Sequence, residues 1–198
     1  HEVLTVASLM SIRSPQVTPA GNEDTARSAH KHFSHPLGDH IAGLNMTRAY
    51  EGSSDREAFC DEWYLDAELM AEVLRIRTQL ADIAAHVGLR GTSGGKMESV
   101  VHCIAIAYFR NVCHRRKKGN GWETATDVRV SIHPGSCLFG KRPDLIVAGD
   151  LVITGRAWAR SCSVIKPDWL VELDPELAWR WGYKKRTTEK RTRAPIPK

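Results

Sequence analysis

The sequence lacks paired cysteine motifs and long apolar runs. Its five cysteines are odd in number, widely spread and never in a C-x-x-C pair, which argues against a disulfide framework or a cysteine zinc site. No run approaches the ~20 apolar residues that span a bilayer, and the start, HEVLTVASLM, lacks a basic leader and a small-residue cleavage site. We therefore expect a soluble intracellular protein with reduced, mostly buried thiols. Because residue 1 is not Met, we interpret it as a cut through a longer chain.

The motifs of a nucleotide-driven motor are also missing. The sequence has no G-x-x-x-x-G-K-[ST], no D-E-x-H and no arginine-finger motif. The glycine-rich stretch LRGTSGGKM fails as a phosphate loop because Arg90 stands where the first Gly is required and Met97 stands where Ser or Thr would reach magnesium. We interpret residues 89–97 as a flexible linker, and we expect no cofactor in this chain.

Positive charge is concentrated at the C-terminal end. The net charge is +5, and residues 184–198, KKRTTEKRTRAPIPK, hold seven basic residues and one acidic residue, so the remainder is nearly neutral. With no apolar period, residues 183–198 are predicted to form a disordered basic tail. Two interpretations stay open for it: contact with RNA phosphates or a nuclear address, and a merely solvated terminus.

The first part of the chain has the pattern of an all-helical domain, predicted over residues 1–88. Apolar residues recur near every third and fourth position, and Gly88 ends the last run. The pattern predicts helices over residues 2–12, 24–35, 39–50 and 55–87, the last as two or three abutting helices.

Strand signals replace helical ones in residues 98–182. A helix after Glu98 is predicted to end in the basic turn HRRKKGNG, and short runs rich in Val, Ile, Thr and Trp follow it. The predicted strands lie in WETAT, VRVSIH, DLIVAGDLVITG and ARSCSVIKPDWLVEL, which suggests a small barrel of about five strands. DPELAWRWG is predicted to be a closing helix, with Asp174 as its cap and Pro175 at its first position. The expected fold class is α+β.

Several collinear motifs resemble those of one family. GDHIAGLN (38–45) resembles GDHLTLLN, AYFRNV resembles G-F-F-x-N-A, and IHPGSCLFGKRPDLIVAGDLVIT (132–154) resembles I-H-P-S-S-x-L-F-x-x-x-P-x-W-V-V-Y-H-E-L-V-x-T. Over residues 2–175 the chain resembles the region that follows the motor lobes in DEAH-box RNA helicases. It departs from the family pattern at Gly135, in Ala148-Gly149-Asp150, and at Tyr64 and Ala67.

The resemblance implies a ratchet-like helical-bundle domain followed by a five-stranded OB-fold barrel. It also implies an accessory role in an ATP-dependent RNA helicase, in which this part grips single-stranded RNA and docks activators such as glycine-rich-patch proteins. ATP and Mg would bind the motor lobes, which this chain lacks, so we expect no activity from it alone. Ribonucleoprotein remodelling such as splicing fits the family, in the nucleus or the cytoplasm, with the nucleus favoured. The alternative is a motor-less RNA- or protein-binding adaptor, and no membrane contact is expected.

By resemblance, six residues are candidate RNA contacts. Two of them lie in the segment Gly-Lys-Arg-Pro (140–143), which is alternatively an ordinary solvated turn. An alternative for Ser136 and the adjacent cysteine is a catalytic nucleophile with His133 as its base. The G-x-S-x-G elbow of such enzymes is absent, because Pro134 stands in the position of its first Gly, so we expect no catalytic residue. A hydroxyl that bonds a phosphate or a turn amide is the better interpretation. The candidates are Lys141, Arg142, Ser136, His133, Arg110 and Asn111.

Four nearby histidines raise a metal alternative, which we reject. Among His30, His32, His35 and His40 only His32 and His35 share a helical face. We expect no metal site, and predict that Asp39 and His40 cap and hydrogen-bond a helix start.

Two further groups of side chains have open roles. One of Arg75 and Arg77 is expected to pair with Asp66, Glu68 or Glu72, and contact with RNA bases is the alternative. Trp63 and Trp169 are predicted core residues, whereas Trp179 and Trp181 are candidates for a partner contact.

Overall fold

The computed structural model describes residues 1–89 and 91–183, so nearly all of the predicted basic tail lies outside the described residues. The chain divides into two compact units, His1–Ile165 and a second that starts at Lys166. The domain boundaries predicted from the sequence stay predictions. None of the helices in the described ranges has the length and hydropathy to cross a membrane.

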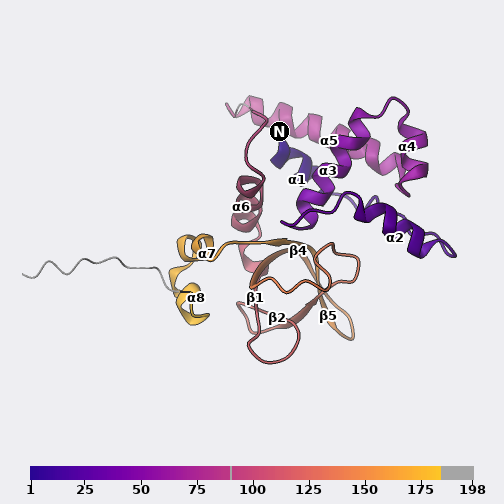
Figure 1. Cartoon of the computed structure of the whole chain (residues 1–198). Coiled ribbons are helices and arrows are strands. Elements are labelled where there is room, and N and C mark those ends of the chain that lie inside the picture. The colour runs from indigo at the N-terminus through magenta and orange to yellow at the C-terminus, as the bar shows by residue number, and fades with distance from the viewer. Residues whose placement is uncertain (90, 184–198) are drawn as a thin grey trace, which may run out of the picture. The chain divides into compact units, whose positions relative to one another are not determined.

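Helices make up the first part of the chain, as predicted (Figure 1). The long signal over residues 55–87 resolves into two helices, because each has its own capping aspartate. Asp55 accepts a hydrogen bond from Ala58 N, and Asp66 accepts one from Leu69 N, both at 3.0 Å. The helices are α1 (Glu2–Met10), α2 (Glu23–Lys31), α3 (Asp39–Gly52), α4 (Arg56–Glu62) and α5 (Ala67–His86).

An apolar cluster forms the core of this helical block. Trp63 packs against it with part of its ring exposed, close to the rings of Phe33 and Phe59, which supports the core role predicted for it. The cluster joins residues of α3, α4 and α5 to residues of the segments that precede α3 and α5, and burial of this apolar surface stabilises the block. Its buried members are Phe33, Met46, Tyr50, Cys60, Leu65 and Met70.

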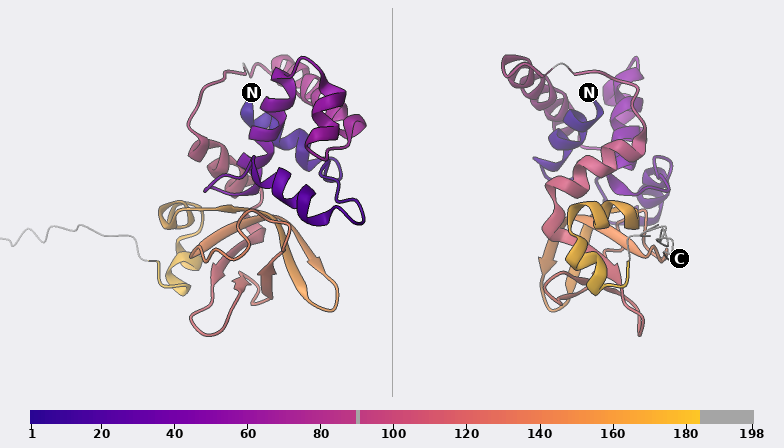
Figure 2. Two further views of the ribbon diagram at one scale, coloured as in Figure 1. Left: turned by 45° about the vertical axis from the view of Figure 1, so that its right-hand side comes forward. Right: turned by 90° about the vertical axis from the view of Figure 1, so that its left-hand side faces the viewer.

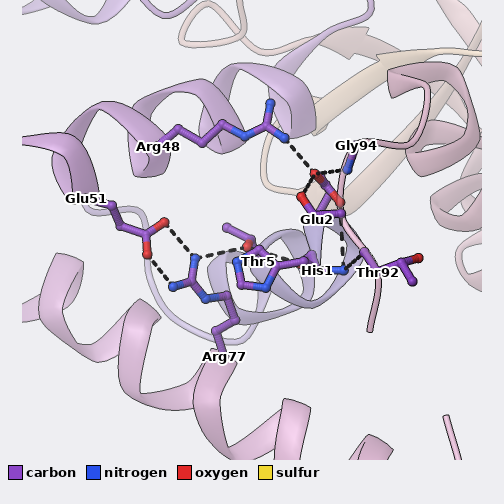
Figure 3. Close-up of polar contacts among 9 residues, drawn as sticks. His1, Glu2, Thr5, Arg48, Glu51, Arg77, Thr92 and Gly94 are labelled. Carbon is purple, nitrogen blue, oxygen red and sulfur yellow. Dashed lines mark hydrogen bonds and ion pairs between the residues drawn. The ribbon is translucent and has the colours of Figure 1, made fainter. Parts of the chain in front are cut away.

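The two arginines of α5 form different ion pairs. Arg75 pairs with Glu72 one turn away, which confirms the expected local pair. Arg77 instead pairs with Glu51 at the end of α3, and its guanidinium also reaches Thr5 Oγ1 of α1 at 3.4 Å (Figure 3). Only 12% of the Arg77 side chain is exposed, so this pair ties three helices together rather than facing a ligand.

A buried carboxylate in α1 holds the segment that follows α5. Glu2 Oε1 accepts hydrogen bonds from Arg48 Nη2 at 2.7 Å, from Ser93 Oγ at 2.7 Å and from Gly94 N at 3.2 Å (Figure 3). The stretch predicted to be a flexible linker is therefore fastened to the helical block at Ser93 and Gly94.

We expect Glu2→Gln to lower the free energy of unfolding by about 3 kcal/mol at neutral pH. The Ser93 hydroxyl and nearby backbone amides lower the pKa of Glu2 from 4.5 to about 2, although burial opposes them. A carboxylate with a depressed pKa stabilises the fold above its unfolded pKa and loses this contribution as pH falls from about 4.5 toward 2. In denaturant titrations, the difference in the free energy of unfolding between wild type and variant should be about half as large at pH 3 as at neutral pH.

Glu72→Gln is the matched control, because Glu72 is more exposed and pairs with Arg75 on the helix surface. We expect a change within about 0.5 kcal/mol at both pH values. If Glu2→Gln lowered the free energy of unfolding equally at neutral pH and at about pH 3, the result would contradict the prediction.

The second half of the first unit is a barrel (Figure 2). It is closed, and its strand order is β1-β2-β3-β5-β4. The β3–β5 pair is parallel and the other pairs are antiparallel. This confirms the predicted five-stranded barrel and the α+β class. The elements are α6 (Met97–Ala107), a 3-10 turn η1 (Phe109–Asn111), β1 (Val112–Arg115), β2 (Trp122–Thr124), β3 (Arg129–Ile132), β4 (Leu145–Ile153) and β5 (Ala157–Val164).

Strand β1 corrects one prediction. His114 and Arg115 were expected in a basic turn, but they lie in this strand. They pair with β2 and β4. Val112 and Cys113 are fully buried, and Arg115 forms an ion pair with Asp144, which satisfies its charge beside the barrel. The turn begins only at the next residue.

The second unit corrects another prediction: of the run ARSCSVIKPDWLVEL that was expected to be strand, the first part lies in β5 but the part from Pro167 onward is helical. Pro167 occupies the first turn of α7 (Pro167–Leu173), where its missing N–H costs no hydrogen bond, whereas in a sheet it would interrupt the ladder. The closing helix is confirmed as α8 (Pro175–Arg180), and the Asp174 side chain caps it by accepting from Leu177 N at 2.9 Å.

The helical block joins the barrel at the start of α3. Gly38 forms a β-bridge with Ser163 of β5, and Val164 N donates to Leu37 O at 2.9 Å. Gly38 has φ +115°, and a Cβ there would lie 2.2 Å from Cys162 O, so only glycine fits.

Asp39 and His40 serve this junction, so the prediction that they cap a helix is wrong. Gly38 is the N-cap of α3, with no side-chain cap bond. Asp39 Oδ1 accepts from Cys137 N at 2.8 Å and Asp39 Oδ2 accepts from Cys162 N at 2.7 Å, so both carboxylate oxygens bond backbone amides outside the helix. His40 Nδ1 lies 2.8 Å from Ser163 Oγ, and burial lowers the pKa of His40 to about 4 although Asp39 opposes the shift.

Candidate nucleic-acid interface

Four of the six predicted RNA contacts lie in one loop between β3 and β4. His133 opens this loop, Ser136 follows it, and the exposed turn of Lys141 and Arg142 closes it. The other two, Arg110 and Asn111, lie in η1, which packs against β4, and Arg110 is exposed.

Two of the loop residues are engaged with the loop's own backbone. Ser136 Oγ accepts from Leu138 N at 3.1 Å, and His133 Nδ1 accepts from Gly135 N at 3.1 Å. This confirms the turn-amide interpretation of Ser136. These bonds shape the loop, and the O–H of Ser136 can still donate to a phosphate while it accepts from Leu138 N.

An arginine stacked on a tryptophan lies next to the start of this loop. The Arg156 guanidinium is 4.8 Å from the centre of the Trp158 ring, and its Nη2 donates to Ser131 Oγ at 2.6 Å. The His133 ring meets Trp158 edge-on, with the centroids 5.6 Å apart. The arrangement holds a cationic plane and an aromatic ring together on the surface of the barrel.

The strand registers place six side chains on one outer surface, which we call the β3–β5 face. Alternate residues of a strand point to the same side, and the parallel pairing puts Ser131 beside Trp158. Arg160 lies farther along the same side of β5 and is exposed. The β3–β5 face consists of Arg129, Ser131, His133, Arg156, Trp158 and Arg160.

Five of these six residues were not predicted from the sequence. The signal that could have found them is the alternation Arg156-Ala157-Trp158-Ala159-Arg160, in which small residues point into the barrel and large ones point out. The prediction for this region started its strand only at Ala159 and therefore passed over Arg156 and Trp158.

The positive charge of the β3–β5 face comes from its arginines. Burial, and then the charge of Arg160, lower the pKa of His133, which favours the neutral form of its imidazole. Asp150 faces Arg160 across the β4–β5 ladder and offsets part of the charge. Arg129 and Arg156 remain as exposed cations on either side of Ser131.

Two barrel loops extend this surface in the way that OB-folds commonly use. The β1–β2 loop, residues 116–121, carries Lys117 and Lys118, both exposed, and the β4–β5 turn ends at Arg156. Oligonucleotide-binding barrels recognise their ligands with the corresponding loops and the strands between them. Basic side chains beside an aromatic ring can pair with phosphates and stack on bases.

The histidines considered for a metal site make other contacts. His30 Nε2 lies 3.0 Å from Tyr64 O, His35 Nδ1 accepts from Leu37 N, and the His32 ring packs on Trp63. No cluster of three or more His, Cys, Asp or Glu that could hold a metal occurs within residues 1–89 and 91–183.

Comparisons with known proteins agree with the geometry. A family model described as an oligonucleotide/oligosaccharide-binding (OB)-fold matches residues 100–177. The chain is 32% identical to mouse ATP-dependent RNA helicase DHX33 and 31% identical to the human protein, in each case over 89% of this chain and 25% of the relative. It is 26% identical to the probable ATP-dependent RNA helicase DHX35 of Pongo abelii over 88% of this chain. The chain thus spans about a quarter of the length of these curated relatives.

Proposed function

Since the chain belongs to the DEAH-box RNA helicases, we propose that its barrel grips single-stranded RNA for the motor of the complete enzyme. The observation that carries the proposal is the Arg156–Trp158 stack on the β3–β5 face, beside the basic loop that ends in Lys141 and Arg142. Phosphates would pair with the arginines and bases would stack on the aromatic and guanidinium planes.

The exposed ring of Phe139 strengthens the proposal for the loop. Phe139 lies two residues before Lys141 and is 56% exposed. A flexible single strand offers both unstacked bases and phosphates. A base can stack on the exposed Phe139 ring, and the phosphates beside it can pair with the two cations. Loop and face meet at His133, so one strand of RNA could follow both.

The proposed task of the whole protein is ATP-dependent remodelling of RNA or ribonucleoproteins. In this proposal the motor lobes pull the strand by ATP hydrolysis, and the barrel with its helical block restrains it. Activator proteins of the glycine-rich-patch type would dock on the same part of the enzyme. A motor-less adaptor, with the barrel alone holding RNA, is the outcome if the gene encodes no motor lobes.

We expect Arg156→Ala/Arg160→Ala to weaken RNA binding about tenfold or more, because each phosphate contact and each stacked group contributes roughly 1 kcal/mol or more. The measurement is the fluorescence anisotropy of a labelled single-stranded RNA of about 15 nucleotides, titrated with the full chain at low and moderate salt. The negative slope of log K against log salt should become shallower by about 0.7 for every arginine–phosphate pair that the variant removes.

Arg13→Ala/Arg27→Ala is the charge-matched control, since both arginines are exposed on the helical block and paired with aspartates. This control should leave affinity within about twofold, because surface pairs contribute little. Equal weakening by both double variants would mean that only net charge matters, and would contradict the assignment of the site. Lys141→Ala/Arg142→Ala tests the loop separately.

A further inference from the structure

One end of the barrel, at the β2–β3 and β4–β5 turns, exposes two apolar side chains. Val128, in the turn before β3, is 37% exposed, and Ile153, the last residue of β4, is 71% exposed. The parallel strands β3 and β5 begin at the same end of the barrel, and β4 ends there because Ile153 pairs with Ala157 at the start of β5. We call Val128 and Ile153 the apolar rim.

Both side chains of the apolar rim lie on the side of their strands that faces the barrel interior. Val128 comes two residues before Val130, a buried member of the barrel core, and alternate residues of a strand share a side. Ala157 packs against the same core, and its partner Ile153 points to the same side, as directly paired residues do. The apolar rim is therefore the solvent-exposed end of the barrel core, and the paired strands fix its position.

Two arginines flank the apolar rim. Arg129 follows Val128 directly, Arg156 lies at the end of the β4–β5 turn, and both are exposed. Both also belong to the β3–β5 face, so the cations of that face continue up to the apolar rim. Asp127 is the acidic residue of the two turns, and the two arginines outweigh its charge.

The order of these features along the barrel suits one kind of ligand. The arginines and Trp158 of the β3–β5 face suit the phosphates and bases of a single strand, whereas an apolar surface offers a phosphate no partner. RNA presents a flat apolar surface at the outer side of the last base pair of a duplex, and isoleucine and other apolar side chains pack against base steps in nucleic-acid complexes. A strand that passes from the β3–β5 face into a duplex would bring that base pair to the apolar rim.

We propose that Val128 and Ile153 contact the terminal base pair of an RNA duplex whose single-stranded extension lies on the β3–β5 face, while Arg129 and Arg156 pair with the phosphates at the junction. The inference rests on the proposed function for RNA as the ligand. It goes beyond that function because it names the substrate class, a duplex with a single-stranded extension, and assigns two aliphatic side chains to the boundary between the two parts.

The affinities of the full chain for two labelled RNAs test the proposal. One is a hairpin with a single-stranded extension of about 10 nucleotides, and the other is the extension alone. Fluorescence anisotropy at moderate salt should show that the hairpin binds at least about fivefold more tightly, because its terminal base pair covers the apolar rim. The extension is placed at the 3′ end in one hairpin and at the 5′ end in another, and a preference for either one supports the proposal.

Ile153→Ser separates the apolar contact from the additional phosphates of the duplex. Because the side chain is mostly exposed, the variant should fold normally. Its preference for the hairpin should fall to within about twofold, while its affinity for the extension alone stays unchanged. Val128→Ser should reduce the preference by a smaller factor, because less of Val128 is exposed. Ile83→Ser is the matched control: Ile83 is 60% exposed on α5, and this variant should keep the full preference.

Two results would overturn the proposal outright: equal binding of both RNAs by the wild type, or a full preference for the hairpin in Ile153→Ser. If Ile153→Ser weakened both RNAs by the same factor, the apolar rim would belong to the single-strand grip, and the assignment to a duplex end would be wrong.

Arg160→Ala separates this inference from the proposed function, because Arg160 lies on the β3–β5 face farther along β5 from the apolar rim. This variant should weaken the binding of both RNAs and keep the preference for the hairpin. If Arg160→Ala left both affinities unchanged while Ile153→Ser removed the preference, the grip on the β3–β5 face would be wrong and the contact with the duplex end would stand. If Arg160→Ala weakened both RNAs and Ile153→Ser kept the preference, the grip would stand and the contact with the duplex end would fail.

Discussion

Gly38→Ala is expected to lower the free energy of unfolding by about 4 kcal/mol, because strain and overpacking add at this position. Gly38 has φ +115° and ψ −165°, a region essentially restricted to glycine. An added Cβ would lie 2.2 Å from Cys162 O and 2.6 Å from Ser163 Cα. Both are backbone atoms of β5, so no side-chain rotation can relieve the clash, and the junction between α3 and the barrel must open.

Gly21→Ala isolates the cost of the backbone conformation alone. Gly21 has φ +83° but nothing lies within 4 Å of its added Cβ, so we expect a decrease of about 1 kcal/mol. Urea unfolding followed by circular dichroism and tryptophan fluorescence measures both variants. Equal decreases at the two glycines would show that the packing of α3 on β5 contributes nothing to stability, which is the opposite of what the structure implies.

Local patterns account for what the sequence predicted well. Apolar spacing and capping residues are encoded within a few positions, so the helices and the closing helix after Asp174 could be predicted with small errors at their ends. The run after Lys166 was misassigned because a short apolar segment suits a strand or a helix equally, and Pro167 decides for the helix. β1 was missed because basic side chains on a strand resemble a turn.

The candidate site was only partly predictable, because it depends on pairing between distant segments. The alternation in Arg156-Ala157-Trp158-Ala159-Arg160 is visible in the sequence, but the stack of Arg156 on Trp158 is joined to Ser131 only by the parallel β3–β5 pair. Likewise, the family resemblance indicated Lys141 and Arg142 from the sequence. Only the folded barrel shows that the loop carrying them starts on the β3–β5 face, where the His133 ring contacts Trp158.

The sequence around Asp39 predicts a helix cap, whereas its carboxylate bonds amides that are far away in the sequence. An aspartate at the start of a predicted helix normally caps it, as Asp55 and Asp66 do. Here the carboxylate reaches amides 98 and 123 residues away, in the β3–β4 loop and in β5. The same side chain therefore fixes the loop that carries the predicted RNA contacts to the helical block.

Asp39→Ala is expected to lower the free energy of unfolding by about 3 kcal/mol, because it leaves two backbone N–H groups without their charged acceptor. Asp39→Asn should recover less than half of this, since its amide offers one acceptor oxygen and turns its NH₂ group toward the second backbone N–H. Denaturant unfolding measures the decrease. Amide hydrogen exchange should accelerate at Cys137 and Cys162 in both variants, and elsewhere far less.

Asp55→Ala supplies the comparison that decides the interpretation. Asp55 accepts one hydrogen bond from its own helix, so its removal should cost about 1 kcal/mol and leave exchange at Cys137 and Cys162 unchanged. If Asp39→Ala cost no more than Asp55→Ala, Asp39 would be an ordinary surface acid. If it costs more and releases both amides, the Asp39 carboxylate is what holds the loop before Lys141 in place, and Asp39→Asn should then weaken RNA binding through that loop although Asp39 touches no RNA.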